Sequence, residues 1–265
     1  MSNSPIGIFD SGVGGLILFS QLEHYLPNET LYYLADTAHF PYGNKSQDEI
    51  IQYSLQNTAF LLDAQVKLIV IACFTASSIA YDSILSHTDI PVISVVESLI
   101  EELERQKSST RVALLGTKAT IQSGIVQKRL SDRGPWSLFP MVGSELVQSI
   151  EKRDEGQSRV ILMEYRDYFK LHNIDTVMLA CTHFAHILPL MKELWGEDIA
   201  IVEGSAATAL KITDALASNK NPEIKSPHRV FSTGSPLEFQ KQAESFVQVD
   251  VEAAHFGINL AFSKL

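Results

Sequence analysis

The sequence has little cysteine, an excess of acidic over basic residues, and no long apolar runs. Only two of its 265 residues are cysteine, and they lie 108 positions apart outside any CxxC motif. We therefore expect neither a structural disulfide nor a zinc site, and no metal. The formal net charge of −10 argues against nucleic acid or an anionic membrane as the main partner, because either would need a basic footprint.

No apolar run is long enough to cross a bilayer, and a strand pattern begins almost at once after the N-terminus, which leaves no room for a signal peptide. We therefore expect a cytoplasmic protein. Apolar residues make up 45% of the chain and charged residues 20%, which is typical of a globular protein with a sizeable core.

Short runs rich in Val, Ile and Leu alternate with helical patterns along the chain. Continuous apolar strands separated by helices indicate a parallel sheet that is covered on both faces. The expected strands cover residues 6–9, 31–36, 67–72, 91–96, 111–116, 177–180, 199–203 and 229–234.

The two halves of the chain match each other at offsets of about 107 positions. The matches are strand 6–9 with 112–115, CFT at 73–75 with CTH at 181–183, and VES at 96–98 with VEG at 202–204. They predict an α/β fold of two pseudo-symmetric domains with mainly parallel sheets. We expect residues 1–98 plus 208–265 to form the first domain, and residues 99–207 the second.

All of these matched polar residues follow strands. In open parallel sheets, ligands bind at the carboxyl ends of the strands. We therefore expect an active site in the cleft between the domains, with Cys73 and Cys181 on opposite walls.

Two facing thiols can invert a carbon acid without a cofactor. One thiolate removes the proton from one face of the carbon while the other thiol delivers a proton to the opposite face. A lone Cys at the end of an apolar strand is more often a packing residue, but a symmetry-related pair favours catalysis. A dithiol redox protein is a further alternative, and it would need the two Cα atoms within about 7 Å.

Three other features are candidate anion or substrate contacts. The segment DSGVGG at residues 10–15 either holds an anionic group with its backbone N–H groups or is a turn in which Asp10 or Ser11 caps the next helix. The aromatic-rich segment at 35–46 is either an ordinary turn or a carboxylate-binding loop. His183 either polarises a thiol, holds a carboxylate, or is structural.

Five blocks of the sequence, in this order, resemble the glutamate racemases of the aspartate/glutamate racemase superfamily. They are IGIFDSGVGGL, YLADTAHFPYGN, IVIACFTAS, LLGTKATIQSG and LACTHF. The resemblance implies interconversion of L- and D-glutamate by a cofactor-independent two-base mechanism, a supply of D-glutamate for bacterial peptidoglycan, and a homodimer.

The resemblance also implies roles for individual residues. Cys73 would act on the α-proton of the D-enantiomer and Cys181 on that of the L-enantiomer, assisted by Asp10 and His183 respectively. Substrate contacts would come from Asp10, Ser11, Pro41, Tyr42, Gly43, Phe74, Thr75, Thr117, Thr182 and His183. Asp36 would tune the site, and either Glu145 or Glu151 would be the acidic residue upstream of the second cysteine.

Phe74 departs from the family pattern, which has Asn at this position. An Asn side chain offers a donor and an acceptor to a zwitterion, and Phe offers neither. Phe74 either weakens substrate binding or turns aside. Two alternatives therefore stay open: a related racemase for aspartate or another small carbon acid, and a catalytically impaired paralogue that only binds its ligand.

Overall fold

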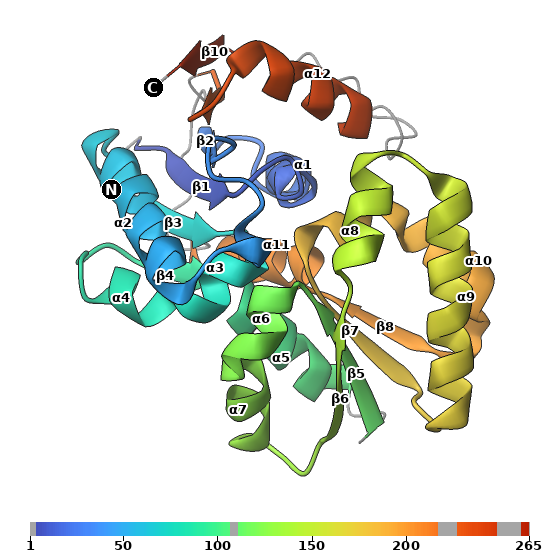
Figure 1. Ribbon diagram of the computed structural model, residues 1–265. Helices are drawn as coiled ribbons and strands as arrows, with labels where there is room; N and C mark the ends of the chain where they lie inside the picture. The colour runs from blue at the N-terminus through green and yellow to red at the C-terminus, as the bar shows by residue number, and fades with distance from the viewer. Residues whose placement is uncertain (1–3, 107–110, 217–226, 248–260, 265) are drawn as a thin grey trace.

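The computed structural model describes residues 4–106, 111–216, 227–247 and 261–264, and within them the strands form two sheets in which every pairing is parallel (Figure 1). The first sheet has the order β10 (Ala261–Lys264), β9 (Arg229–Ser232), β2 (Leu31–Ala35), β1 (Ile6–Asp10), β3 (Leu68–Ile71), β4 (Val92–Ser94). The second has the order β6 (Ser137–Val142), β5 (Arg111–Gly116), β7 (Thr176–Ala180), β8 (Ala200–Glu203).

The two sheets repeat one strand order. The order β2-β1-β3-β4 in the first sheet corresponds to β6-β5-β7-β8 in the second, with equivalent strands in the same sequential order. This repetition confirms the predicted α/β fold of two pseudo-symmetric halves with parallel sheets. It also places the carboxyl ends of β3 and β7 at equivalent positions.

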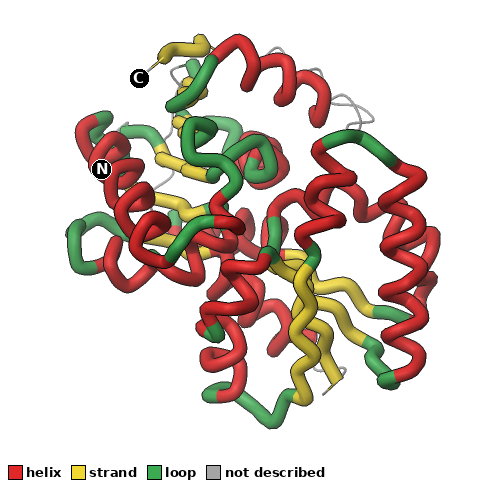
Figure 2. The backbone as a smooth tube through the Cα atoms, in the orientation of Figure 1, coloured by secondary structure: helices red, strands yellow, loops and turns green. Residues whose placement is uncertain are grey.

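Helices cover both sheets, as Figure 2 shows. The α-helices are α1 (Leu16–Tyr25), α2 (Gln47–Asp63), α3 (Phe74–Ile79), α4 (Tyr81–Leu85), α5 (Val95–Gln106), α6 (Lys118–Ser123), α7 (Ile125–Ser131), α8 (Ser144–Glu151), α9 (Glu155–Leu171), α10 (Leu188–Trp195), α11 (Gly204–Ala215) and α12 (Pro236–Val247). The 3-10 turns are η1 (Tyr42–Asn44), η2 (Thr182–Ile187) and η3 (Gly196–Asp198). None of the helices in the described part of the chain is long and apolar enough to span a bilayer.

Side chains start several of these helices by accepting hydrogen bonds from backbone N–H groups. Ser46 and Glu49 form a reciprocal capping box at α2, and Thr117 caps α6. Glu203 accepts from the N–H groups of Ser205 and Ala206 at the start of α11. Neither Asp10 nor Ser11 caps α1, because Gly15 is its N-cap residue and no side chain bonds there.

Alternate residues of each strand point to opposite faces of the second sheet and enter different apolar clusters. Leu115 and Leu179 pack in the cluster that contains residues of α9 and α10. Leu114 and Met178 pack in the cluster that contains residues of α5 and α7. Both faces are therefore covered, which explains why these strands read as continuous apolar runs.

The structure corrects the strands expected from the sequence in two respects and leaves the domain boundaries untested. The strand expected at 91–96 ends at Ser94, because α5 begins at Val95. The sequence did not indicate β6 or β10, and β6 contains Pro140 and is largely half-exposed or exposed, as befits an edge strand. The domain boundaries at 98 and 207 stay a prediction, and residues 217–226 and 248–260 of the expected tail lie outside the described residues.

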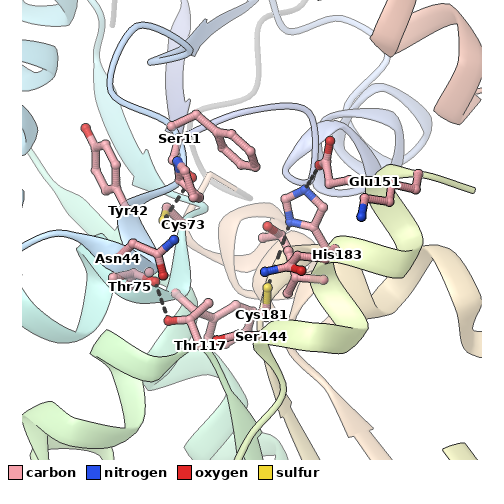
Figure 3. Close-up of a pocket in the computed structure, with 18 residues that line it drawn as sticks. Ser11, Tyr42, Asn44, Cys73, Thr75, Thr117, Ser144, Glu151, Cys181 and His183 are labelled. Atoms are coloured by element: carbon pink, nitrogen blue, oxygen red, sulfur yellow. Dashed lines mark hydrogen bonds and ion pairs between the residues drawn. The ribbon is translucent and has the colours of Figure 1, made fainter. Parts of the chain in front are cut away.

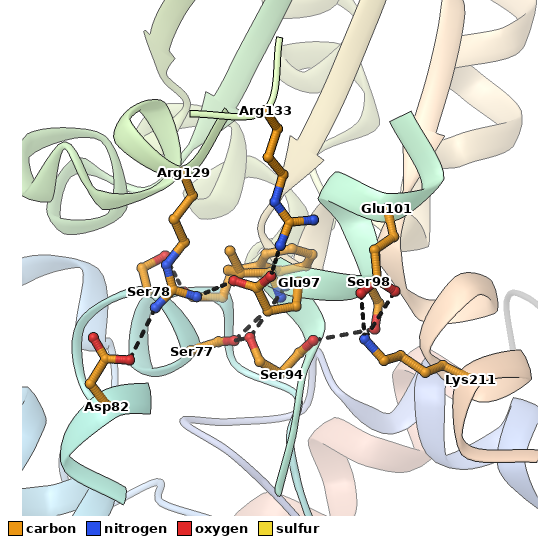
Figure 4. Close-up of polar contacts among 12 residues, drawn as sticks. Ser77, Ser78, Asp82, Ser94, Glu97, Ser98, Glu101, Arg129, Arg133 and Lys211 are labelled. Atoms are coloured by element: carbon orange, nitrogen blue, oxygen red, sulfur yellow. Dashed lines mark hydrogen bonds and ion pairs between the residues drawn. The ribbon is translucent and has the colours of Figure 1, made fainter. Parts of the chain in front are cut away.

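An ion-pair cluster joins elements of both halves (Figure 4). Glu97, near the start of α5, accepts from Arg133 at 2.6 Å and also pairs with Arg129 of α7. Arg129 in turn lies 3.4 Å from Asp82 of α4. Helix α4 follows β3 of the first sheet, and α7 follows β5 of the second sheet. The ion pairs between them therefore help to fix the two halves relative to each other.

Candidate active site

Cys73 and Cys181 lie at equivalent positions of the two halves. Cys73 follows β3 and immediately precedes α3, and Cys181 follows β7 and immediately precedes η2. Both thiols are free and buried. They line one cavity of about 250 Å³, and Figure 3 shows them on different sides of it. The structure therefore brings together the two cysteines that lie far apart in the sequence.

Most of the residues expected to contact substrate also line this cavity. They are Ser11, Pro41, Tyr42, Gly43, Phe74, Thr75, Thr117, Thr182 and His183. Two further lining residues, Phe40 and Asn44, belong to the candidate loop at 35–46, whereas the sequence did not indicate Ser144, Val147, Gln148 and Lys152. The last four, together with Glu151, recur at helical spacing along one face of α8 and its C-terminal end, and that periodicity is the signal that could have found them.

Cys181 lies beside a histidine and a carboxylate. Its Sγ is 3.9 Å from Nδ1 of His183, and Nε2 of the same ring contacts Oε1 of Glu151. Burial alone would lower the pKa of His183, but its contacts with Cys181 and Glu151 outweigh that effect and raise the pKa to about 10. His183 is therefore an imidazolium at neutral pH and places a positive charge beside the sulfur of Cys181.

The structure distinguishes the two glutamates that the sequence left open. Glu151, at the end of α8, contacts His183 and lines the cavity. Glu145, in the first turn of the same helix, is exposed and lies outside the cavity wall. Glu151 is thus the acidic residue that can act on the Cys181 side.

Cys73 has different neighbours. Its thiol donates a hydrogen bond to Oγ of Ser11 over 3.7 Å. Burial raises the pKa of this thiol to about 12, and the negative charge of Asp10 adds to the increase. The thiol form therefore prevails at Cys73 when the cavity holds no cation.

Asp10 is fully buried behind the cavity, at the end of β1, and is not part of its wall. One carboxylate oxygen accepts hydrogen bonds from the N–H of Gly12 at 3.0 Å and from Oγ of Ser11 at 3.3 Å. Burial raises the pKa of Asp10, and the positive charge of His183 opposes that increase. Asp10 is therefore connected to the cavity through Ser11, which lines it.

Asp36 supports the loop that carries Pro41, Tyr42 and Gly43, and it does not line the cavity. Its carboxylate accepts hydrogen bonds from Oη of Tyr42 at 2.5 Å and from Oγ1 of Thr233 at 2.6 Å. A tuning role for Asp36 would therefore operate through the position of Tyr42.

Phe74 turns into the protein core. Its side chain is 2% exposed and packs in the apolar cluster that contains Val95 of α5 and Val112 of β5. The absence of a side chain at Gly204 makes room for the ring, since a Cβ there would lie 2.9 Å from Cζ of Phe74. The structure thus shows the turned-aside arrangement, and Phe74 closes part of the cavity wall without offering a polar contact.

The cavity is mixed in polarity. Among the described residues, Lys152 is the one Lys or Arg in its wall, and Glu151 is the one carboxylate. Within the same described ranges, no group of three or more His, Cys, Asp or Glu side chains is placed to hold a metal ion. The chemistry that these residues support is proton transfer between the thiols and a small polar ligand.

Comparison with known proteins identifies the class of enzyme to which this site belongs. The model of the Asp/Glu/Hydantoin racemase family matches residues 17–212, and the chain belongs to that family of amino-acid racemases. Glutamate racemase of Streptococcus suis (strain 05ZYH33) is 31% identical over 263 residues, which cover 96% of this chain and 99% of that protein.

Solved structures agree. The crystal structure of a glutamate racemase isoform from Bacillus anthracis has a TM-score of 0.86 and 27% identity, covering 96% of this chain and 98% of that one. The structure of glutamate racemase from Francisella tularensis in complex with D-glutamate has a TM-score of 0.84 and 31% identity, covering 100% of this chain and 98% of that one.

Proposed function

We propose that this protein is a glutamate racemase that interconverts L- and D-glutamate with Cys73 and Cys181 as its two bases and without a cofactor. The observation that carries the proposal is the position of the two thiols, at equivalent strand ends and on different sides of one small cavity. The full-length similarity to glutamate racemases supports glutamate as the substrate. The cavity of about 250 Å³ suits a small amino acid, since pockets for drug-sized ligands measure roughly 300–1,000 Å³.

The reaction needs only proton transfers. One thiolate takes the α-proton, so that a C–H bond breaks and an S–H bond forms, and the electron pair delocalises into the α-carboxylate. The opposite thiol then gives its proton to the other face of the carbon, which leaves it as the thiolate. Each turnover therefore exchanges the protonation states of the two cysteines, and hydrogen-bond donors on the carboxylate stabilise the intermediate charge.

The two sides of the site differ in their electrostatics. Burial keeps Cys73 as a thiol, and the imidazolium of His183 places a positive charge beside Cys181. With L-glutamate, Cys73 would therefore supply the proton to one face of the α-carbon while Cys181 acts as the base on the other. For D-glutamate, Cys73 must first lose its proton, and the ammonium group of the bound substrate would favour that loss.

Among the expected binding residues, the hydroxyl and backbone donors of the cavity wall would hold the carboxylates. Ser11, Thr75, Thr117 and Thr182 supply hydroxyls, and Tyr42 and Gly43 supply backbone N–H groups, since Pro41 has none. We further propose that the protein works in the cytoplasm, supplies D-glutamate for peptidoglycan, and forms a homodimer.

Deuterium exchange tests the proposal. The protein is incubated with L-glutamate and separately with D-glutamate in D2O, with loss of the α-proton followed by NMR and chirality by circular dichroism. We expect inversion with deuterium incorporation, and loss of inversion in both Cys73→Ala and Cys181→Ala. Absence of exchange from either enantiomer would refute the glutamate assignment, and inversion of aspartate at a higher rate would favour the related racemase instead.

A further inference from the structure

Three threonine hydroxyls meet where the two halves touch, beside the cavity. Oγ1 of Thr75, on α3, lies 2.9 Å from Oγ1 of Thr117 and 3.2 Å from Oγ1 of Thr120. The hydroxyls of Thr117 and Thr120, which belong to the loop and helix after β5, are 2.9 Å apart. The result is a closed triangle of hydroxyls, and Figure 3 shows the Thr75–Thr117 side of it.

The three members differ in exposure. Thr75 and Thr117 line the cavity, whereas Thr120 does not and is 0% exposed. Thr117 also has little freedom to move. Its Oγ1 accepts a hydrogen bond from the N–H of Thr120 at 3.2 Å, and a Cβ at Gly43 would lie 2.9 Å from its own Cβ, so the Gly43 backbone packs closely against it.

Proton counting gives Thr120 a role. Each hydroxyl has one proton to donate and two lone pairs to accept with. In an empty cavity, each member of the triangle can donate to the next, which leaves no proton for a ligand. When a carboxylate enters and both Thr75 and Thr117 donate to it, the remaining proton in the triangle is that of Thr120, which then donates to one of their oxygens.

We propose that Thr120 is a positioning residue that allows Thr75 and Thr117, one from each half, to donate simultaneously to one substrate carboxylate. Thr120 never touches the substrate. Its single proton can donate to either of the two oxygens whose own protons have turned to the ligand, and its oxygen stays within 3.2 Å of both, so that it supports the two hydroxyls that face the cavity. The inference rests on the proposed function, because it assumes a carboxylate ligand in this cavity.

The expected effect is on binding. Removing one neutral hydrogen bond of this kind weakens an interaction by a factor of about three to ten. The carboxylate is present in both the substrate and the transition state, so the loss should appear mainly as a higher KM with a nearly unchanged kcat. The KM of both enantiomers should rise, because the triangle makes no hydrogen bond to either cysteine and would hold the carboxylate in both directions of the reaction.

Two substitutions at Thr120 and one elsewhere test the proposal. Thr120→Val removes the hydroxyl at nearly constant volume, and Thr120→Ser retains it. Thr208→Val is the matched control, because Thr208 is also 0% exposed and its hydroxyl donates to the carbonyl of Gly204 at 2.6 Å, outside the cavity wall. KM and kcat are measured in both directions, with the Kd of D-glutamate by calorimetry and Tm as a check on folding.

We expect Thr120→Val to raise KM and Kd about three- to tenfold, while Thr120→Ser and Thr208→Val keep the native KM. An unchanged KM and Kd in Thr120→Val would overturn the inference, and so would equal impairment in Thr120→Ser, which would make the role steric. If the native protein binds glutamate without inverting it, the proposed function fails and Kd still tests Thr120. If the native protein binds no glutamate at all, both fail.

Discussion

Phe74 gives the sharpest test of how this chain differs from the family pattern. If its ring packs in the core between the halves, Phe74→Ala leaves a cavity there. Truncating a buried Phe costs about 3–5 kcal/mol, against a total free energy of unfolding of about 5–15 kcal/mol for a typical domain. In a protein of this size, each kcal/mol lowers Tm by about 2–4 °C, so we expect a decrease of about 6–20 °C.

Comparison with two other substitutions at this position separates packing from polarity. Phe74→Met conserves much of the apolar volume and should cost less than about 1.5 kcal/mol. Phe74→Asn installs the residue that the family pattern has, but here it buries an amide among apolar side chains. That adds about 1–3 kcal/mol for the unsatisfied polar group, so the Asn variant should be less stable than the Ala variant. Thermal and urea unfolding, with racemisation rates measured well below Tm, provide the assay.

Gly204 provides the decisive control, because its lack of a side chain makes room for the Phe74 ring. Gly204→Ala should destabilise the native protein through the 2.9 Å approach to Cζ, and should cost less in the Phe74→Ala background, where the 3.1 Å approach to Cγ2 of Val95 remains. The two effects are therefore non-additive in a double-mutant cycle. Additive effects would refute the packing of the ring against Gly204. A Phe74→Asn protein that is as stable as the native one and more active would show that the side chain at this position serves the binding site more than the core.

Three further predictions concern charge. Iodoacetamide labelling, located by mass spectrometry, should leave Cys73 largely unmodified at pH 8 and modify it increasingly above pH 10, because its pKa is raised to about 12. Rapid labelling of Cys73 at pH 8 would contradict that raised pKa. Glu151→Gln removes a contact that raises the pKa of His183, so the alkaline limb of the L-to-D kcat/KM profile should move to lower pH, whereas Glu145→Gln should leave it in place. Glu97→Gln should lower Tm by about 2–8 °C, corresponding to about 1–2 kcal/mol, and by less in 1 M NaCl; equal losses at both salt concentrations would exclude an ionic contribution.

The sequence was informative about the fold where strands are buried on both faces. Continuous apolar runs locate β1, β3, β5 and β7 almost to the residue, because helices cover both faces of each sheet. The same reasoning fails for β6, which is largely half-exposed or exposed and contains Pro140, so it lacks the apolar run. Local pattern also cannot decide where β4 gives way to α5, because Val95 and Val96 suit a strand as well as a buried helix start.

The site was predictable to the extent that it lies at strand ends. The duplicated Cys-x-Thr and Cys-Thr segments follow equivalent strands, so parallel topology alone places them near one another. The wall contributed by α8 was not predictable, because residues such as Val147 and Gln148 read as an ordinary amphipathic face until the helix is docked. The choice of Glu151 over Glu145 and the direction of Phe74 depend on the distant contacts with His183 and Gly204, which no local pattern encodes.

The departures from symmetry explain how a duplicated fold can work with two unequal thiols. The repeated strand order supplies the geometry, because it brings two cysteines to one cavity from two halves. The neighbours then divide the labour: His183 and Glu151 place positive charge beside Cys181, whereas burial and Asp10 keep Cys73 protonated. In the proposed two-base reaction, one sulfur must take a proton while the other gives one up. Two identical environments would not distinguish these roles, whereas the unlike neighbours of Cys73 and Cys181 would favour such a division between the two halves.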